Sequence, residues 1–271
     1  MIKQLLSIYE KIFSNTYFYK FNKFLFIASS KGLGIDNSNL IIQKSENTFL
    51  SYFFSNYNQK EKLIIFDVGA NIGEYSCKIK EMNNSVDVYA FEPHPNTFKK
   101  LIATSKRVGF NAIQMGCSDK SGIIKFYDYL HSDSTEHATM LKDVIEDIHH
   151  SESKEIEVEI TTIDDFMKAN SIKNINLLKI DTEGFEFNVL KGAVNALNNN
   201  MIDVIHFEFN SMNMVSRVFM RDFIKLLPNY TLFRILSNSL ILIDLKHQLL
   251  TEIFMFQNIV AIHHSKPMPI N

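Results

Sequence analysis

Short apolar segments alternate with amphipathic ones from residue 63 onward, and no other feature of the sequence restricts the fold as strongly. Three apolar runs, at 63–68, 86–91 and 111–117, are typical of buried strands. The segment between the last two begins at Pro95 and ends at Gly109, as expected of a helix. Strands separated by helices form right-handed crossovers, so the sequence predicts an α/β fold with a parallel sheet.

The second half of the chain continues this pattern and then changes it. Helices are predicted at 184–197 and 214–227, and strands at 123–129, 156–160, 175–180 and 204–209. Three β segments without a long helix between them follow, at 230–236, 240–245 and 258–263. We therefore expect about seven main strands in one domain, with an antiparallel end to an otherwise parallel sheet.

The first sixty residues differ in character from the rest. Ile2, Leu5 and Ile12 recur at helical spacing, so an amphipathic helix is predicted there. We favour packing of this helix on the main domain or on a second copy of the chain. Contact with a membrane surface, aided by Lys20 and Lys23, is the alternative.

The chain is expected to have three parts. Residues 1–60 form an N-terminal helical extension, and residues 61–271 form the main domain. A polar stretch at 131–155, which contains four histidines and many carboxylates, interrupts the main domain. The irregular spacing of these histidines favours a lid over a metal site.

Composition excludes several classes of protein. A formal charge of −2 and a pI of about 6.5 give no basic face for nucleic acid. The two cysteines, Cys77 and Cys117, are far apart in sequence, which favours a reducing compartment over a disulfide framework. No apolar run approaches the length of a membrane-spanning helix. We therefore expect a cytoplasmic protein.

The most informative segment is 64–75, in which a buried strand ends at Asp67 and turns through Gly69 and Gly73 into a helix. Glycines let the backbone approach a ligand closely, and a helix N-terminus offers free N–H groups. Such a turn lies at the carboxyl edge of a parallel sheet, where α/β sheets bind ligands. Asn71 stands at the position of the middle glycine of a dinucleotide fingerprint, so the backbone is less able to approach a pyrophosphate closely.

Polar residues also end the next two strands. Glu92 stands where a carboxylate accepts hydrogen bonds from ribose hydroxyls, and it would repel a 2′-phosphate. Ser118 and Asp119 end the third strand and suit the edge of an adenine. We infer an adenosyl ligand that lacks a pyrophosphate and carries a charged amino-acid tail. This description fits S-adenosylmethionine.

Several segments of the chain resemble the FkbM-type methyltransferases. The matching motifs lie at 66–73, 90–93, 162–166, 178–186 and 189–193. The Asp-Thr-Glu-Gly sequence at 181–184 is the most distinctive of them, because many methyltransferases share the glycine turn.

This resemblance implies a Rossmann-like class I methyltransferase fold, with a seven-stranded, mostly parallel sheet, one antiparallel strand near the edge and helices on both faces. It also implies O-methylation that depends on S-adenosylmethionine, often of sugar hydroxyls in cell-surface glycans or secondary metabolites. The residues expected to bind the cofactor are Asp67, Gly69, Asn71, Gly73, Tyr75, Glu92, Ser118 and Asp119.

Methyl transfer to a sugar hydroxyl requires alignment of the acceptor and removal of its proton. Asp181 ends the fourth strand beside the expected crevice, and Glu183 follows in the same turn. His206 and Glu208 are two residues apart in the fifth strand and therefore share a face. These four residues are the catalytic candidates.

Each candidate also has a purely structural interpretation. Asp181 or Glu183 would cap the helix that follows, and His206 would be a hydrogen-bonded core residue. Asp181 and Glu208 form an oxygen-rich pair that suits a magnesium-class ion, but we do not favour a metal.

The leading hypothesis is an O-methyltransferase that uses S-adenosylmethionine and acts on a hydroxyl of a sugar or a surface-glycan precursor. An NAD-dependent sugar oxidoreductase or epimerase is the second hypothesis, and Asn71 disfavours it. A non-catalytic, adenosyl-binding scaffold subunit that recruits a partner through the N-terminal helix is the third.

Overall fold

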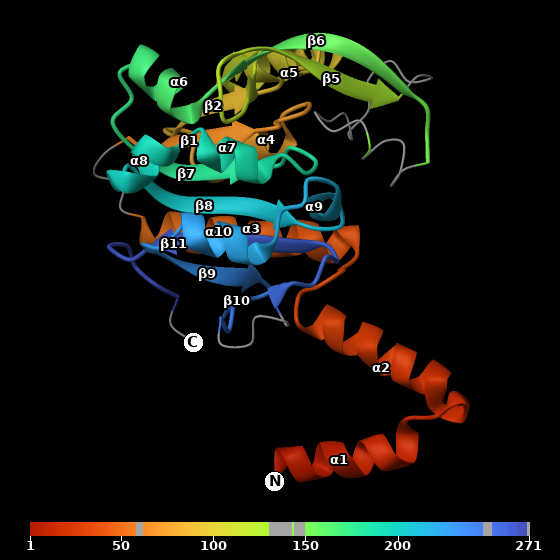
Figure 1. Cartoon of the computed structure of the whole chain (residues 1–271). Helices are drawn as coiled ribbons and strands as arrows, with labels where there is room; N and C mark the ends of the chain where they lie inside the picture. Colours follow the sequence, from red (N-terminus) through yellow and green to blue (C-terminus); the bar gives the residue numbers. More distant parts are fainter. Residues whose placement is uncertain (58–61, 130–142, 144–149, 246–250, 270–271) are drawn as a thin grey trace.

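The computed structural model describes residues 1–57, 62–129, 143, 150–245 and 251–269. Within these residues the centre of the molecule is an eight-stranded sheet of order β10-β9-β11-β8-β7-β1-β2-β3 (Figure 1). Its strands are β1 (Ile64–Val68), β2 (Asp87–Phe91), β3 (Asn111–Ile113), β7 (Ile175–Ile180), β8 (Ile202–Phe209), β9 (Tyr230–Ile235), β10 (Leu240–Leu242) and β11 (Gln257–His263).

Most of this sheet is parallel. Strands β3, β2, β1, β7 and β8 run in one direction, and β11 lies antiparallel between β8 and β9. The predicted Rossmann-like sheet with one antiparallel strand near the edge is thus confirmed. It has an eighth strand, because a turn closed by the Leu236 N–H and the Ser239 carbonyl adds β10 antiparallel to β9.

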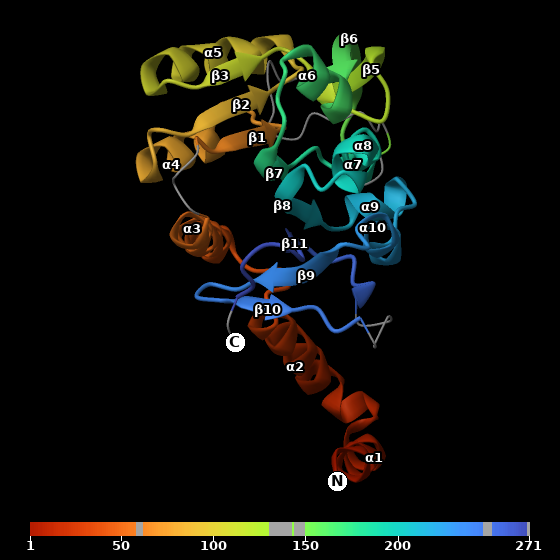
Figure 2. The same ribbon diagram turned by 90° about the vertical axis from the view of Figure 1, so that its left-hand side faces the viewer.

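Helices cover both faces of the sheet, as predicted (Figure 2). One face packs against α3 (Asn39–Asn56), α4 (Glu74–Met82) and α5 (Pro95–Val108). The other face packs against α6 (Ile163–Ala169), α7 (Glu186–Lys191), α8 (Val194–Asn198) and α10 (Met220–Leu226). Alternate residues of each strand enter the two cores, so Ile65 joins the α3 side and Phe66 the α6 side.

A second, three-stranded sheet lies beside the first. It contains β4 (Gly116–Cys117), β6 (Ser153–Thr161) and β5 (Gly122–Tyr129), in that order. The single strand predicted at 111–117 is therefore wrong, because β3 pairs with β2 while β4 pairs with β6. Most of the predicted lid at 131–155 lies outside the described residues.

Two predicted helices are each divided. The segment 184–197 forms α7 and α8, which are separated at Gly192, where a Cβ would lie 1.9 Å from the Ser118 carbonyl oxygen. The segment 214–227 forms α9 (Met212–Val215) and α10, and the left-handed Arg217 lies between them.

The N-terminal residues form α1 (Ile2–Phe13), a short 3-10 turn η1 (Thr16–Phe18), α2 (Tyr19–Gly32) and α3. Helices α1 and α2 project from the rest of the molecule in both views (Figures 1 and 2). Helix α3 buries Phe49, Leu50 and Phe53 against the sheet. Among the described residues, no helix is long and apolar enough to cross a membrane.

Candidate active site

The turn from β1 into α4 is held in a left-handed backbone conformation. Gly69, Asn71 and Gly73 have φ angles of 79°, 49° and 91°. A Cβ on Gly69 would lie 1.7 Å from the carbonyl oxygen of Asp181, so only glycine lets the ends of β1 and β7 approach this closely. The turn thus brings the Asp67–Gly73 segment directly beside Asp181.

Three polar residues form a row across the sheet on its α3–α4 face. Asp67 of β1 is in register with Lys179 of β7, and Lys179 is in register with His206 of β8. The carboxylate of Asp67 is buried and accepts a hydrogen bond from the Ser76 hydroxyl at 2.6 Å. Burial raises its pKa to about 6.

Lys179 is the centre of this row. Its Nζ lies 3.0 Å from Asp181 Oδ2 and 5.5 Å from the centre of the Tyr75 ring. Burial by itself lowers the pKa of Lys179, but the carboxylates of Asp181, Glu208, Glu46 and Asp67 outweigh it and raise the pKa. The residue is therefore a buried cation that these carboxylates hold in place.

Glu208 lies beside Asp181 at the ends of β7 and β8. The register pairs Ile180 with Phe207, so the next residue of each strand, Asp181 and Glu208, meet at the carboxyl edge. Burial and the charge of Asp181 raise the pKa of Glu208 well above its ordinary value. Glu208 therefore holds its proton to a higher pH than an ordinary glutamate does.

A cavity of about 340 Å³ opens at this edge. Seven of the predicted site residues line it, namely Asp67, Gly69, Asn71, Tyr75, Asp181, Glu183 and Glu208. Helix α3 supplies a further wall through Asn39, Ile42 and Glu46, and Glu46 pairs with Lys78 of α4 at 2.9 Å. The N-terminal segment thus contributes directly to the cavity.

Glu92, the predicted ribose ligand, lies at the end of β2 next to the glycine turn. Its carboxylate accepts hydrogen bonds from the N–H groups of Asn71, at 3.1 Å, and His94, at 2.8 Å. Burial raises the pKa of Glu92 to about 7, although these two bonds favour the charged form. Glu92 therefore holds the turn in its present geometry, but it is not among the residues that line the cavity.

The other predicted cofactor residues lie outside the cavity lining. Gly73 precedes α4 and packs against Leu101 and Phe110, which leave no room for a side chain. Ser118 donates a hydrogen bond to Asp119, and Asp119 forms an ion pair with Lys191 at 3.1 Å.

His206 lies behind the cavity. Its Nδ1 is 3.0 Å from the Tyr75 hydroxyl, and its Nε2 is 3.0 Å from the Asn258 side-chain oxygen. The ring is fully buried, so burial and the nearby Lys179 lower its pKa well below the ordinary value and keep the imidazole neutral. Tyr75, which lines the cavity, connects His206 to it.

The turn after β7 is held by a residue that the sequence analysis did not single out. One carboxylate oxygen of Glu186 accepts hydrogen bonds from the N–H groups of Thr182 and Gly184 and from the Thr182 hydroxyl. Helix α7 has no side-chain N-cap bond. Asp181 and Glu183 line the cavity, and Glu186 stabilises the turn.

Lys179 and Glu46 were also missed. A lysine within an otherwise apolar strand, two residues before Asp181, was a usable signal because such residues share a face. Glu46 gave no comparable signal, because it lies far from the motifs in sequence. Among the described residues, no group of three or more His, Cys, Asp or Glu side chains is arranged to hold a metal ion.

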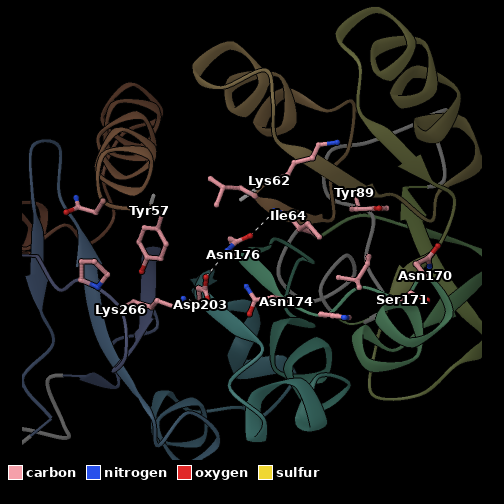
Figure 3. A pocket seen from close by; sticks show the side chains of 15 residues that line it. Tyr57, Lys62, Ile64, Tyr89, Asn170, Ser171, Asn174, Asn176, Asp203 and Lys266 are labelled. Atoms are coloured by element: carbon pink, nitrogen blue, oxygen red, sulfur yellow. Dashed lines mark hydrogen bonds and ion pairs between the residues drawn. The ribbon is translucent and has the colours of Figure 1, made fainter. Parts of the chain in front are cut away.

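A larger cavity, of about 860 Å³, lies at the opposite, amino edge of the sheet (Figure 3). Asp203, which lines this cavity, forms an ion pair with Lys266 at 3.0 Å and accepts a hydrogen bond from Asn176 at 2.8 Å. Asn176 in turn accepts a bond from the Ile64 N–H. These groups satisfy one another and tie the starts of β1, β7 and β8 together.

Comparison with known proteins places the chain in a family. Residues 67–231 match the model of the methyltransferase FkbM domain, and the chain belongs to the FkbM methyltransferase family. The recognition made from the sequence motifs is thereby confirmed.

Curated relatives match about half of the chain. Hexuronic acid methyltransferase AglP of Haloferax volcanii is 35% identical over 51% of this chain and 53% of its own length. The 31-O-demethyl-FK506 methyltransferase FkbM of Streptomyces tacrolimicus is 30% identical over 49% of this chain and 60% of its own length. The chain therefore spans little more than half the length of these relatives.

Solved methyltransferases also resemble the chain at low identity. The METTL16 methyltransferase domain aligns with a TM-score of 0.46 and 7% identity, over 80% of this chain and 66% of that one. The plantazolicin methyltransferase BpumL in complex with SAH aligns with a TM-score of 0.44 and 11% identity, over 81% and 83%.

Proposed function

We propose that the chain is an O-methyltransferase that uses S-adenosylmethionine and methylates a hydroxyl of an uncharged sugar or glycan precursor. The observation that carries the proposal is that residues of the Asp67–Gly73 turn line the same cavity as Asp181 and Glu208. Family membership and the names of the relatives support the same reaction.

The residues around the turn suit this cofactor. Asp67 and Glu92 are buried carboxylates with raised pKa values, so each gains from a ligand that donates hydrogen bonds or carries positive charge. The cofactor has ribose hydroxyls, an ammonium group and a sulfonium. We assign the ribose hydroxyls to Glu92 and the amino-acid tail to the turn at Gly69 and Asn71.

The chain's own residues carry out the remaining chemistry. When bound, S-adenosylmethionine supplies a methyl group that is already activated for in-line displacement. Asp181 accepts the proton that the acceptor hydroxyl loses, and Lys179 orients Asp181 through their 3.0 Å contact. Glu208 lines the cavity beside Asp181 and hydrogen-bonds the acceptor, and Glu183 lines the same cavity.

Tyr75 and His206 act as positioning residues in this proposal. Tyr75 lines the cavity, and its hydroxyl is held by the neutral ring of His206. Asn258 holds the far side of that ring, so the orientation of Tyr75 is fixed from β8 and β11. Loss of His206 would therefore affect the cavity through Tyr75.

The charges around the cavity favour an uncharged acceptor. Six acidic residues line it, against two lysines, Lys78 and Lys179. Even with the cofactor's net positive charge added, the cavity remains acidic and would repel an anionic acceptor. A neutral sugar is therefore expected to be a better substrate than a uronic acid, which is the acceptor class in the name of the Haloferax relative.

Calorimetric titration with S-adenosylhomocysteine, with NAD as the control ligand, tests the cofactor. Saturable binding of S-adenosylhomocysteine alone is expected, and binding of NAD alone would contradict the proposal. Methyl transfer to neutral sugars and to uronic acids, followed by mass spectrometry, then tests the acceptor. A preference for the uronic acids would disprove the charge argument while leaving the cofactor assignment intact.

A further inference from the structure

The N-terminal arm, residues 1–33, leaves a large apolar surface uncovered. No residue of α1 is buried, and Ser30 is the one buried residue of α2. Figures 1 and 2 show both helices extending away from the sheet and its covering helices. The part of the body that the structure describes therefore does not cover the apolar residues of the arm.

Helix α1 separates its apolar and polar residues completely. At 100° per residue, its polar side chains occupy one arc, and these are Lys3, Gln4, Ser7, Glu10 and Lys11. The remaining arc holds Ile2, Leu5, Leu6, Ile8, Tyr9, Ile12 and Phe13. Five of these, namely Ile2, Leu5, Leu6, Ile8 and Ile12, are between 52% and 70% exposed.

The apolar surface continues past the bend between the two helices. The centroids of the Phe13 and Phe18 rings are 4.7 Å apart, and the Asn22 side chain donates a hydrogen bond to the Phe13 carbonyl at 2.8 Å. Beyond this bend, Phe24 and Phe26 of α2 are also exposed. These contacts set the angle between α1 and α2, so the arm is a defined element.

The arm carries the opposite charge to the rest of the chain. Residues 1–33 contain five lysines and one glutamate, a net charge of +4. The whole chain has a formal charge of −2, so the other residues carry −6. Two copies of the arm would repel each other, whereas a surface of negative charge would attract each of them.

We propose that the arm binds the surface of a membrane that contains anionic lipids. The apolar arc of α1 and the phenylalanines of α2 enter the boundary between headgroups and acyl chains, and the lysines contact lipid phosphates. An apolar face rich in aromatic and branched side chains, opposite a lysine-bearing polar face, is typical of helices that lie in the interface. The −6 body stays away from the anionic surface.

Flotation of the full-length protein with vesicles tests this proposal. We expect binding to vesicles of phosphatidylglycerol and phosphatidylcholine, weaker binding to pure phosphatidylcholine, and a decrease as salt is raised. The double variant Lys3→Gln/Lys11→Gln should lower the affinity for anionic vesicles by about 25-fold, since each lysine near such a surface contributes about fivefold.

Two further variants separate charge from apolar burial. Leu5→Ser/Leu6→Ser should abolish binding to both kinds of vesicle without changing the melting temperature, because both side chains are exposed. Lys106→Gln/Lys120→Gln removes two exposed lysines of the body and should leave vesicle binding unchanged.

Light scattering in the absence of lipid tests whether the arm instead binds a second copy of the chain. A stable dimer that Leu5→Ser/Leu6→Ser converts to a monomer, together with no flotation, would show that a second copy covers the arm and would overturn the proposal. Flotation that is equal for neutral and anionic vesicles would overturn the role of the lysines. Neither result bears on cofactor binding, which is measured separately.

Discussion

The two edges of the central sheet both place charged groups at strand ends, but they use them differently. At the amino edge, Asp203, Lys266 and Asn176 satisfy one another around the larger cavity. At the carboxyl edge, Asp181 and Glu208 are adjacent, and both face a smaller cavity that also exposes two residues in left-handed backbone conformations, Asn71 and Glu183. The proximity of like charges, rather than cavity size, distinguishes the edge that suits chemistry.

The largest effect is expected at the point where β1 and β7 touch. Gly69→Ala places a Cβ 1.7 Å from the Asp181 carbonyl oxygen and should cost about 4 kcal/mol or more of stability. Gly109→Ala is the matched control, because its φ is also positive, at 88°, but its Cβ meets open space; about 1–2 kcal/mol is expected. Chemical denaturation measures both, and equal losses would refute the contact.

Two aspartates test the contrast between the edges directly. Asp181→Asn should lower turnover by about 100-fold or more, the usual contribution of a general base. Asp203→Asn should leave turnover unchanged but lower stability by about 1–3 kcal/mol, because a buried group loses a partner. Full activity of Asp181→Asn in a methyl-transfer assay would end its assignment as the base.

Cofactor affinity should depend on Glu92. Glu92→Gln keeps one acceptor oxygen for the turn but loses the charge, and we expect binding of S-adenosylhomocysteine to weaken by about 1.5–3 kcal/mol. Glu81→Gln, at an exposed position of α4, is the control. Calorimetry on both variants decides whether Glu92 contacts the ligand. An unchanged affinity of Glu92→Gln for S-adenosylhomocysteine would show that Glu92 does not bind the cofactor.

The smallest effect is a dependence of affinity on pH. In the free protein the pKa of Glu92 is raised to about 7, so the group is protonated below that value and a poorer acceptor for ribose hydroxyls. Affinity for S-adenosylhomocysteine should therefore fall as the pH drops below about 7 and level off above it. Titrations across this range should show a flatter profile for Glu92→Gln, and an affinity that rises on acidification would contradict the assignment.

The sequence predicted those helices and strands whose signals lie within their own segment of the chain. Pro95 and Gly109 delimit α5, and the period of the apolar runs predicts the parallel strands. The divisions of the longer helices were not predictable in this way. Gly192 ends α7 where the Ser118 backbone approaches, a contact between residues that are far apart in sequence.

The same distinction applies to the candidate site. Residues within motifs, such as Asp67 and Asp181, were found because local spacing places them at strand ends. Glu46 was not, because its presence in the cavity depends on how α3 packs on the sheet. The pattern of α3 is weak, since Asn and Ser residues interrupt its apolar positions and favour helix ends over helix interiors.

The position of α3 has a consequence for how the protein matures during synthesis. The hydroxyl of Thr48 bonds to the Ser237 carbonyl, and that of Tyr52 bonds to the Pro267 carbonyl, so the helix is anchored to segments about 190 and 215 residues later. Helix α3 leaves the ribosome early but cannot dock until nearly the whole chain has followed it. The wall that carries Glu46 is therefore completed late, because a nascent chain acquires it only when α3 has met the segments at Ser237 and Pro267.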